Sequence, residues 1–197
     1  MSQDPSRLDD YVQGVQGREP DQTNGLMFEI IARRWLREVV KGYWVNAQNL
    51  VVPTKPDGRH LIEIDAFSLT RPDNQYVAAA AEVKWRFHIS PDMGIFDRKS
   101  GRPLRDIVAE RLEKLAEHFN EWLGIQLNYA EVALVSAHPV DGKDRHASDL
   151  SAALSGKGIG CEGVRVYDIN DMYESVRSGD HPLRGVIAYL KTRYIAP

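Results

Sequence analysis

Hydrophobic side chains between residues 27 and 39 recur with the period of an α-helix. They stand at positions 27, 28, 31, 32, 35, 36 and 39, which share one helical face. Thr23 and Asn24 are typical residues at a helix start, and Gly42 after Lys41 is typical of a helix end. The pattern predicts one amphipathic helix between these signals.

Three segments rich in strand-forming residues follow, with turn residues between them. Pro56, Asp57 and Gly58 separate the first two segments, and the turn at residues 71–75 separates the second from the third. Because the connections are short, the three strands are predicted to pair as an antiparallel meander. Their expected bounds are residues 45–52, 60–69 and 76–85.

The rest of the chain alternates between helical and strand patterns. Residues 87–102 contain a proline and two glycines without regular alternation and predict a loose segment. The elements expected after it are a helix at 103–123, a strand at 130–136, a helix at 148–154, a strand at 164–167, a short helix capped by Asn170 and a helix at 182–194. A strand, a helix and a strand in succession favour a parallel crossover. The predicted fold class is α/β, with a mixed central sheet of an antiparallel meander plus parallel strands, flanked by helices.

Composition places the chain among globular proteins. It has 197 residues, of which 43% are hydrophobic and 27% charged, and its single cysteine, Cys161, cannot form an internal disulfide. A signal peptide and a membrane-length run of about 20 apolar residues are both missing from the sequence. A cytoplasmic protein without membrane contact is expected. Residues 1–23 predict a flexible acidic tail, and residues 24–197 a single domain.

The charge is unevenly distributed along the chain. The net charge of -3 argues against a protein that coats nucleic acid through bulk charge. Residues 1–24 contain five acids and two arginines, whereas residues 84–114 contain eight lysines and arginines against five acids. Two interpretations of this basic segment remain open: a surface that faces phosphate groups, and an ordinary solvated helix face.

Three tripeptides place an acid two residues before a lysine: residues 82–84, 97–99 and 141–143. Only residues 82–84 close an apolar strand, whereas residues 97–99 and 141–143 lie in segments without apolar alternation and are expected to be solvated turns. A two-residue turn at Asp73 and Asn74 pairs Asp65 with Glu82 and Glu63 with Lys84, and puts all four side chains on one face. The same register predicts that Ile62, Ile64 and Ala66 share the other face with Ala81, Val83 and Trp85.

Opposed carboxylates repel each other unless a cation lies between them. Mg²⁺ prefers such hard oxygen ligands, and it polarises a phosphoryl oxygen and activates water. Lys84 is expected to orient this water or to stabilise charge on phosphorus. The pattern therefore predicts hydrolysis of phosphodiesters. The histidines show no zinc-ligand spacing, and residues 156–160 do not match a phosphate-binding loop.

These residues resemble the PD-(D/E)XK nuclease superfamily. The resemblance rests on Gly25 to Glu29 in an N-terminal helix, on Ile64 and Asp65, and on residues 82–84 at the end of the third strand, and it covers residues 24–137. Ile64 replaces the proline of the motif's name. The likeness implies a restriction endonuclease-like core and points to the Holliday junction resolvase-like or ATPase-associated branches.

The resemblance also implies roles for individual residues. Asp65, Glu82 and the Val83 carbonyl are expected to bind Mg²⁺, for which Mn²⁺ is expected to substitute. Lys84 is expected to be the catalytic lysine, and Glu29 an outer or second-metal acid. The implied function is a Mg²⁺-dependent deoxyribonuclease, expected to be an endonuclease acting on DNA, and the analogy favours a homodimer.

Two other functions remain open. The first is a catalytically weak or inactive DNA-binding module of the same fold that works with a partner ATPase or restriction subunit. The second is a structural protein whose acids and bases are surface residues. For Glu29, an ordinary charge on a helix surface is the alternative to a catalytic role, and for Glu63 a surface position is favoured over a ligand.

Overall fold

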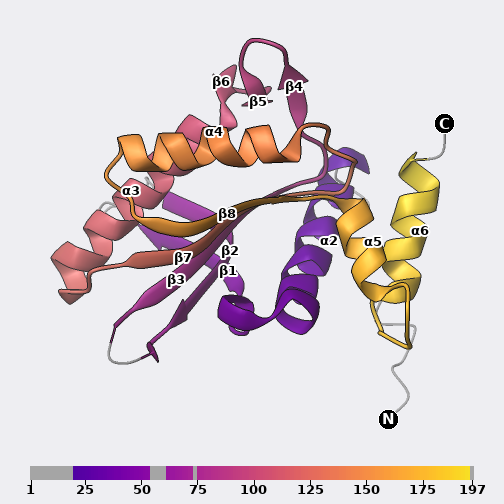
Figure 1. Ribbon diagram of the computed structural model, residues 1–197, viewed down its shortest axis with the longest axis horizontal. Coiled ribbons are helices and arrows are strands. Elements are labelled where there is room, and N and C mark those ends of the chain that lie inside the picture. Colours follow the sequence, from indigo (N-terminus) through magenta and orange to yellow (C-terminus); the bar gives the residue numbers. More distant parts are fainter. Residues whose placement is uncertain (1–19, 54–60, 73–74, 196–197) are drawn as a thin grey trace.

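The three strands predicted as a meander lie side by side in the central sheet of the protein. The structure is a computed structural model that describes residues 20–53, 61–72 and 75–195. Its central sheet has five strands in the order β1-β2-β3-β7-β8 (Figure 1). The bounds of these strands are β1 Gln48–Pro53, β2 Leu61–Thr70, β3 Val77–Lys84, β7 Asn128–Ser136 and β8 Cys161–Tyr167.

The sheet is mixed, as the sequence predicts. β1, β2 and β3 pair antiparallel, whereas β3, β7 and β8 pair parallel. The two parallel connections pass through α3 and α4, which agrees with the need for a crossover between parallel strands. The helices are α2 Pro20–Trp35, α3 Leu104–Leu123, α4 Lys143–Gly156, α5 Ile169–Val176 and α6 Arg184–Ile195, with a π-helical turn η1 Leu36–Val40 and a 3₁₀ turn η2 Gly42–Trp44. The prediction of an α/β class is confirmed.

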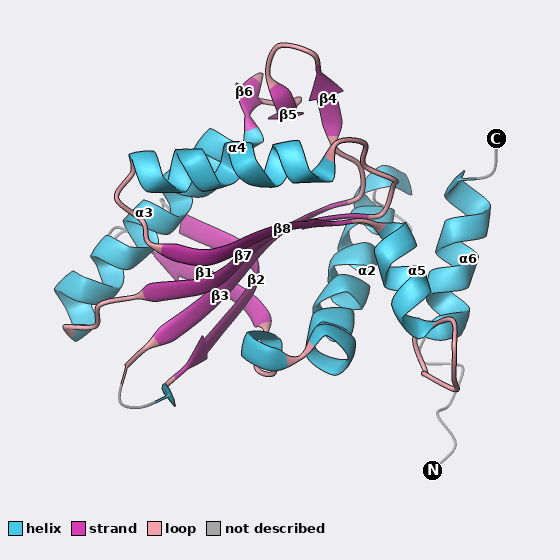
Figure 2. Ribbon diagram, viewed as in Figure 1, coloured by secondary structure: helices cyan, strands magenta, loops and turns pink. Residues whose placement is uncertain are grey.

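Helices cover both faces of the sheet (Figure 2). On one face, the sheet packs against α2, α5 and α6. The buried hydrophobic residues of this layer are here named the α2-side cluster, which includes Ala79, Ala81 and Val83. The other face packs against α3 and α4, and its buried hydrophobic residues are named the α3-side cluster, which includes Ala78 and Ala80. The alternating alanines of β3 therefore line both cores, because successive strand residues point to opposite faces.

A second, small sheet stands where the sequence predicts a loose segment. Its three strands are β4 His88–Ser90, β5 Gly94–Asp97 and β6 Arg102–Pro103, in the order β4-β5-β6. Phe87 and Ile95 anchor it in the α3-side cluster, and Arg105 Nη1 donates to the Met93 carbonyl at 2.9 Å. Strands of two to four residues are too short to show alternation, which is why the pattern does not predict them.

Several predicted element ends are wrong. Helix α2 begins at Pro20 instead of at a cap formed by Thr23 and Asn24, β1 begins at Gln48 because Trp44 is buried in a 3₁₀ turn, and α4 begins at Lys143. The turns predicted at residues 54–58 and at 73–74, and residues 1–19 of the predicted tail, lie outside the described residues.

Within the described parts of the chain, no helix is both long enough and apolar enough to cross a membrane.

Candidate active site

Asp65 lies within a β-bulge of β2. The ladder joins Leu50 to Ile64 and then Gln48 to Phe67, so two steps along β1 match three steps along β2. A bulge of this kind bends its strand and changes the direction of the side chains around it. The extra residue therefore falls where the candidate acid stands.

The bulge corrects the predicted assignment of side chains to faces. The sequence predicts Ile64 and Ala66 on one face, but Ile64 packs in the α3-side cluster and Ala66 in the α2-side cluster. The prediction is wrong because one extra residue reverses the alternation of the strand. Glu63 does not pair with Lys84 in the ladder; its exposed carboxylate accepts a hydrogen bond from Asn49 Nδ2 at 3.4 Å.

The register between β2 and β3 is the predicted one. Its pairs end at Ala66 with Ala81, one residue before Asp65 and Glu82 would oppose each other. Beyond this pair the acceptor is a side chain instead of a backbone carbonyl: Asp65 Oδ2 accepts a hydrogen bond from the Val83 N–H at 2.7 Å. The bond keeps Asp65 beside the tripeptide that the sequence singles out.

Lys84 connects the two candidate acids. Its Nζ lies 2.6 Å from Glu82 Oε1 and 3.5 Å from Asp65 Oδ2. Glu82 is only 3% exposed and Asp65 only 6%, so the ion pairs are shielded from solvent on the acid side. Burial alone would lower the pKa of Lys84, but the carboxylates of Glu82 and Asp65 raise it above its ordinary value. Lys84 therefore stays protonated.

Helix α2 brings Glu29 to the same site. Arg33, one helical turn after Glu29, connects Glu29 to Asp65. Its Nη1 donates to the Asp65 carbonyl at 2.9 Å and lies 3.8 Å from Glu29 Oε2. Burial, and next the charge of Asp65, raise the pKa of Glu29 to about 7. The sequence-predicted residues Glu29, Asp65, Glu82 and Lys84 are thus neighbours in the structure.

The buried Asp65 carboxylate lies beside the negative charge of Glu82. Burial, and next the charge of Glu82, raise the pKa of Asp65 to about 6, although Lys84 and the Val83 N–H act in the opposite direction. Such a shift is typical of acids that lack enough positive charge around them. A further cation would be stabilised between them.

Arg111 belongs to the site, although the sequence pattern indicates only that it is part of the basic segment at residues 84–114. From helix α3 its Nη1 donates to Glu82 Oε2 at 2.7 Å. The helical spacing could have indicated this position. Arg111 stands three residues after Val108 and four before Leu115, and both of these residues are buried on the sheet-facing side of α3. A cation beside the buried stripe of a helix requires a partner, and the partner is Glu82.

The donor set fits a divalent cation. Asp65 and Glu82 offer hard carboxylate oxygens, and Glu82 Oε1 is buried without a hydrogen bond of good geometry, although Lys84 forms an ion pair with it. Val83 stands between them with its N–H bound to Asp65, and a metal-binding role of its carbonyl stays a prediction. In residues 20–53, 61–72 and 75–195, no group of three or more His, Cys, Asp and Glu is arranged to hold a metal.

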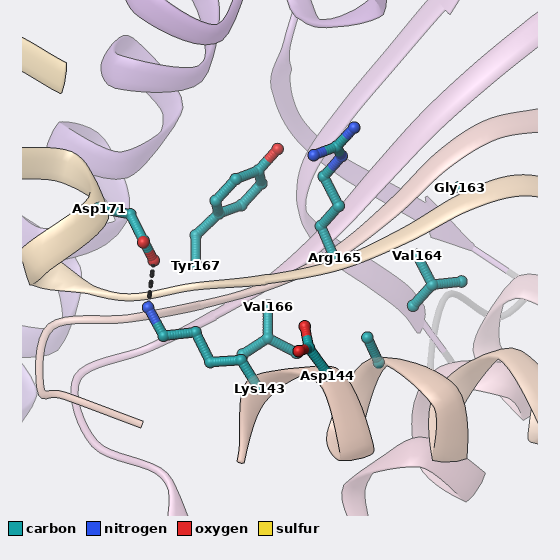
Figure 3. A pocket seen from close by; sticks show the side chains of 9 residues that line it. Lys143, Asp144, Gly163, Val164, Arg165, Val166, Tyr167 and Asp171 are labelled. Carbon is teal, nitrogen blue, oxygen red and sulfur yellow. Dashed lines mark hydrogen bonds and ion pairs between the residues drawn. The ribbon is translucent and has the colours of Figure 1, made fainter. Parts of the chain in front are cut away.

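The other two tripeptides serve local structure. Asp97 accepts hydrogen bonds from the N–H and hydroxyl of Ser100 in a turn, as the sequence analysis expects. Lys143, predicted to lie in a solvated turn, instead opens α4 and its Nζ lies 2.9 Å from Asp168 Oδ2 and 2.6 Å from Asp171 Oδ2. Lys143 lines a hollow of about 420 Å³ along β8 (Figure 3), and its ion pairs keep it from serving as a free cation there.

The site thus joins two buried carboxylates with two cations at one end of the β2–β3 ladder. Two such acids can hold a hard divalent ion, and the lysine and arginine beside them can neutralise an anionic substrate. The geometry therefore suits chemistry on phosphate esters. Comparison of the chain with protein-family models, with curated protein sequences and with solved structures gave no match.

Proposed function

We propose that this protein is a Mg²⁺-dependent nuclease that hydrolyses DNA phosphodiester bonds. The observation that carries the proposal is the position of Lys84 Nζ, 2.6 Å from Glu82 and 3.5 Å from Asp65, with both acids buried. Paired carboxylates can hold a metal ion that activates water, and an adjacent lysine can stabilise the charge that develops on a phosphate ester.

Each side chain has a separate task in this proposal. Asp65 and Glu82 would hold the ion, which when bound would polarise the phosphoryl oxygen and lower the pKa of a water molecule. Lys84 stabilises the negative charge that develops on the phosphate, and its raised pKa keeps the required proton in place. Glu29, with its pKa near 7, can take up a proton from the attacking water close to neutral pH.

The fold supports the likeness to PD-(D/E)XK nucleases without deciding it. The mixed sheet with helices on both faces, the position of Glu29 on the first described helix and the acids on β2 and β3 all agree with a restriction endonuclease-like core. By the same analogy we propose DNA as the substrate and a homodimer as the form that cuts both strands.

The small sheet offers a surface for the nucleic acid. It follows directly after Lys84, and Arg86, Arg98 and Lys99 are exposed there. The hydrogen bonds of Ser100, and to a smaller extent the charge of Lys84, lower the pKa of Asp97, so this turn lies within electrostatic reach of the site. These cations favour the interpretation of the basic segment as a phosphate-facing surface.

The decisive experiment is a cleavage assay with a matched lysine control. The purified chain with Mg²⁺ or Mn²⁺ should cleave plasmid, single-stranded or branched DNA, and Lys84→Ala should abolish the cleavage. Lys157→Ala should not, because Lys157 is as exposed as Lys84 but is ion-paired with Glu113 instead of with Asp65 and Glu82. Cleavage that survives in Lys84→Ala would refute the mechanism.

A binding module is the second candidate, and one observation favours it. Both oxygens of Glu82 already face a cation, Lys84 on Oε1 and Arg111 on Oε2. A site neutralised in this way can stabilise the fold without a metal and without catalysis, while a partner ATPase or restriction subunit supplies the activity. Calorimetry with Mn²⁺ separates the two: binding that Asp65→Asn weakens supports the nuclease, and absence of binding supports the module.

A further inference from the structure

Arg111 is the cation that helix α3 presents to the candidate site. Its Nη1 donates to Glu82 Oε2 at 2.7 Å, and its side chain is 37% exposed while Glu82 is almost fully buried. We infer that Arg111 binds a phosphate group of the nucleic acid directly beside the two carboxylates, an inference that rests on the proposed nuclease function.

The guanidinium has more donors than Glu82 uses. Arginine carries five N–H groups in a planar fork, which matches the oxygens of a phosphate. In the part of the chain that the structure describes, its hydrogen bond to the site uses Nη1 alone. The exposed fraction of the side chain leaves other donors free to meet a ligand from solvent.

The position of Glu82 explains why the ligand is a phosphate. Asp65 and Glu82 would hold a divalent ion, and its charge would attract an anionic oxygen of the substrate to these carboxylates. Arg111 is bound to one of those carboxylates, so a phosphate that reaches the ion comes within reach of the guanidinium. Lys84 approaches the other oxygen of Glu82, at 2.6 Å, and the two cations therefore flank the acid.

A purely structural role predicts different behaviour. If Arg111 only neutralises Glu82, its removal leaves the buried Glu82 Oε2 without its cation while Lys84 still pairs with Oε1, and both the fold and the metal site are weakened. If Arg111 binds phosphate, its removal weakens binding of the nucleic acid, while metal binding is kept or tightens because a competing cation has gone. Binding of metal and binding of DNA therefore move differently in the two cases.

The experiment measures both quantities without relying on cleavage. Arg111→Gln keeps most of the side-chain volume and removes the charge, and Arg111→Lys keeps the charge without the fork. DNA affinity is measured by fluorescence anisotropy with labelled single-stranded and duplex oligonucleotides over a salt series, with Ca²⁺, which takes the same oxygen ligands, in place of Mg²⁺, and again in EDTA. Mn²⁺ affinity is measured by calorimetry, and folding by circular dichroism. Arg177→Ala, which removes an exposed arginine paired with Glu174, is the control.

We expect Arg111→Gln to weaken DNA binding about tenfold and to lower the salt slope by about one, with unchanged or tighter Mn²⁺ binding. The DNA affinity of Arg111→Lys should lie between those of wild type and Arg111→Gln. If Arg111→Gln does not fold, the DNA affinity of Arg111→Lys tests the inference. DNA affinity equal to that of wild type in both variants, or equal losses of Mn²⁺ and DNA binding, overturns the inference.

The outcome is separable from that of the proposed function. A wild-type protein that cleaves DNA together with an unaffected Arg111→Gln variant refutes the role of Arg111 and leaves the nuclease standing. A wild-type protein that binds DNA through Arg111 but does not cleave it refutes the nuclease and leaves the phosphate contact standing.

Discussion

The Asp65 carboxylate and the Val83 N–H form the hydrogen bond that closes the β2–β3 ladder, at 2.7 Å. Asp65 thus replaces a backbone acceptor at the point where the strands separate, because the bulge in β2 has shifted the main chain. One oxygen of the carboxylate is used for structure. The same oxygen, Oδ2, lies 3.5 Å from Lys84 Nζ, so one carboxylate oxygen joins the end of the ladder to the candidate site.

Replacing Asp65 should separate its structural role from its metal-binding role. Asp65→Asn keeps an oxygen that can accept from Val83 and removes the repulsion with Glu82, so its free energy of unfolding should change little. Asp65→Ala leaves a buried N–H unpaired and should lose about 1–3 kcal/mol. Both variants should lose Mn²⁺ binding. Urea denaturation and calorimetry measure the two effects, and equal destabilisation of both variants would contradict the role of the hydrogen bond.

A second pair of substitutions tests the start of α5. The sequence predicts Asn170 as the cap, but the side chain of Asp168 accepts hydrogen bonds from the N–H groups of Asn170 and Asp171, and from that of Val140. Asp168→Ala should lower the free energy of unfolding by about 1–3 kcal/mol, whereas Asn170→Ala should change it by less than about 0.5 kcal/mol. Thermal or urea denaturation of the two variants checks this order. A larger loss of unfolding free energy in Asn170→Ala than in Asp168→Ala would support Asn170 as the helix cap, as predicted from the sequence.

The sequence suffices for the parts of the site that depend on local pattern. The apolar run of β3 and the turn chemistry of residues 71–75 predict the register that the structure shows from Ala66–Ala81 to Thr70–Val77, and this register brings Asp65 close to Glu82. The helical stripe from Phe28 to Leu36 places Glu29 on a helix above the sheet. Both inferences need only the periods of strand and helix.

The remaining features depend on contacts distant in sequence. The bulge at Asp65 is one extra residue whose pairing with β1 has no local signature, and it reverses the faces of Ile64 and Ala66. Arg111 meets Glu82 across 29 residues, and only the packing of α3 on the sheet brings them together. Neither relation follows from a periodic pattern, because both depend on how separate elements dock.

Gly94 should be the least replaceable glycine of the small sheet. Its φ is +68°, and an added Cβ would meet His146 Nδ1 at 3.4 Å. Gly101 has nearly the same φ, +67°, with nothing within 4 Å. Gly101→Ala should therefore lose about 1 kcal/mol through its backbone alone, and Gly94→Ala more, because the imidazole must also move. Urea denaturation compares the two, and equal losses would show that the His146 contact has no cost.

The stability of the metal-free protein should rise as the pH falls from about 8 to about 5. The pKa values of Glu29 and Asp65 are raised in the folded state, from 4.5 to about 7 and from 3.8 to about 6. In this window the folded protein binds protons that the unfolded chain does not, so acidification favours folding, by roughly 1–3 kcal/mol in total. Glu29→Gln imitates the protonated acid and should stabilise the protein near pH 8 and flatten the slope. Urea denaturation across this pH window tests the prediction. A wild-type stability that falls with acidification would contradict the raised pKa values of the buried Glu29 and Asp65.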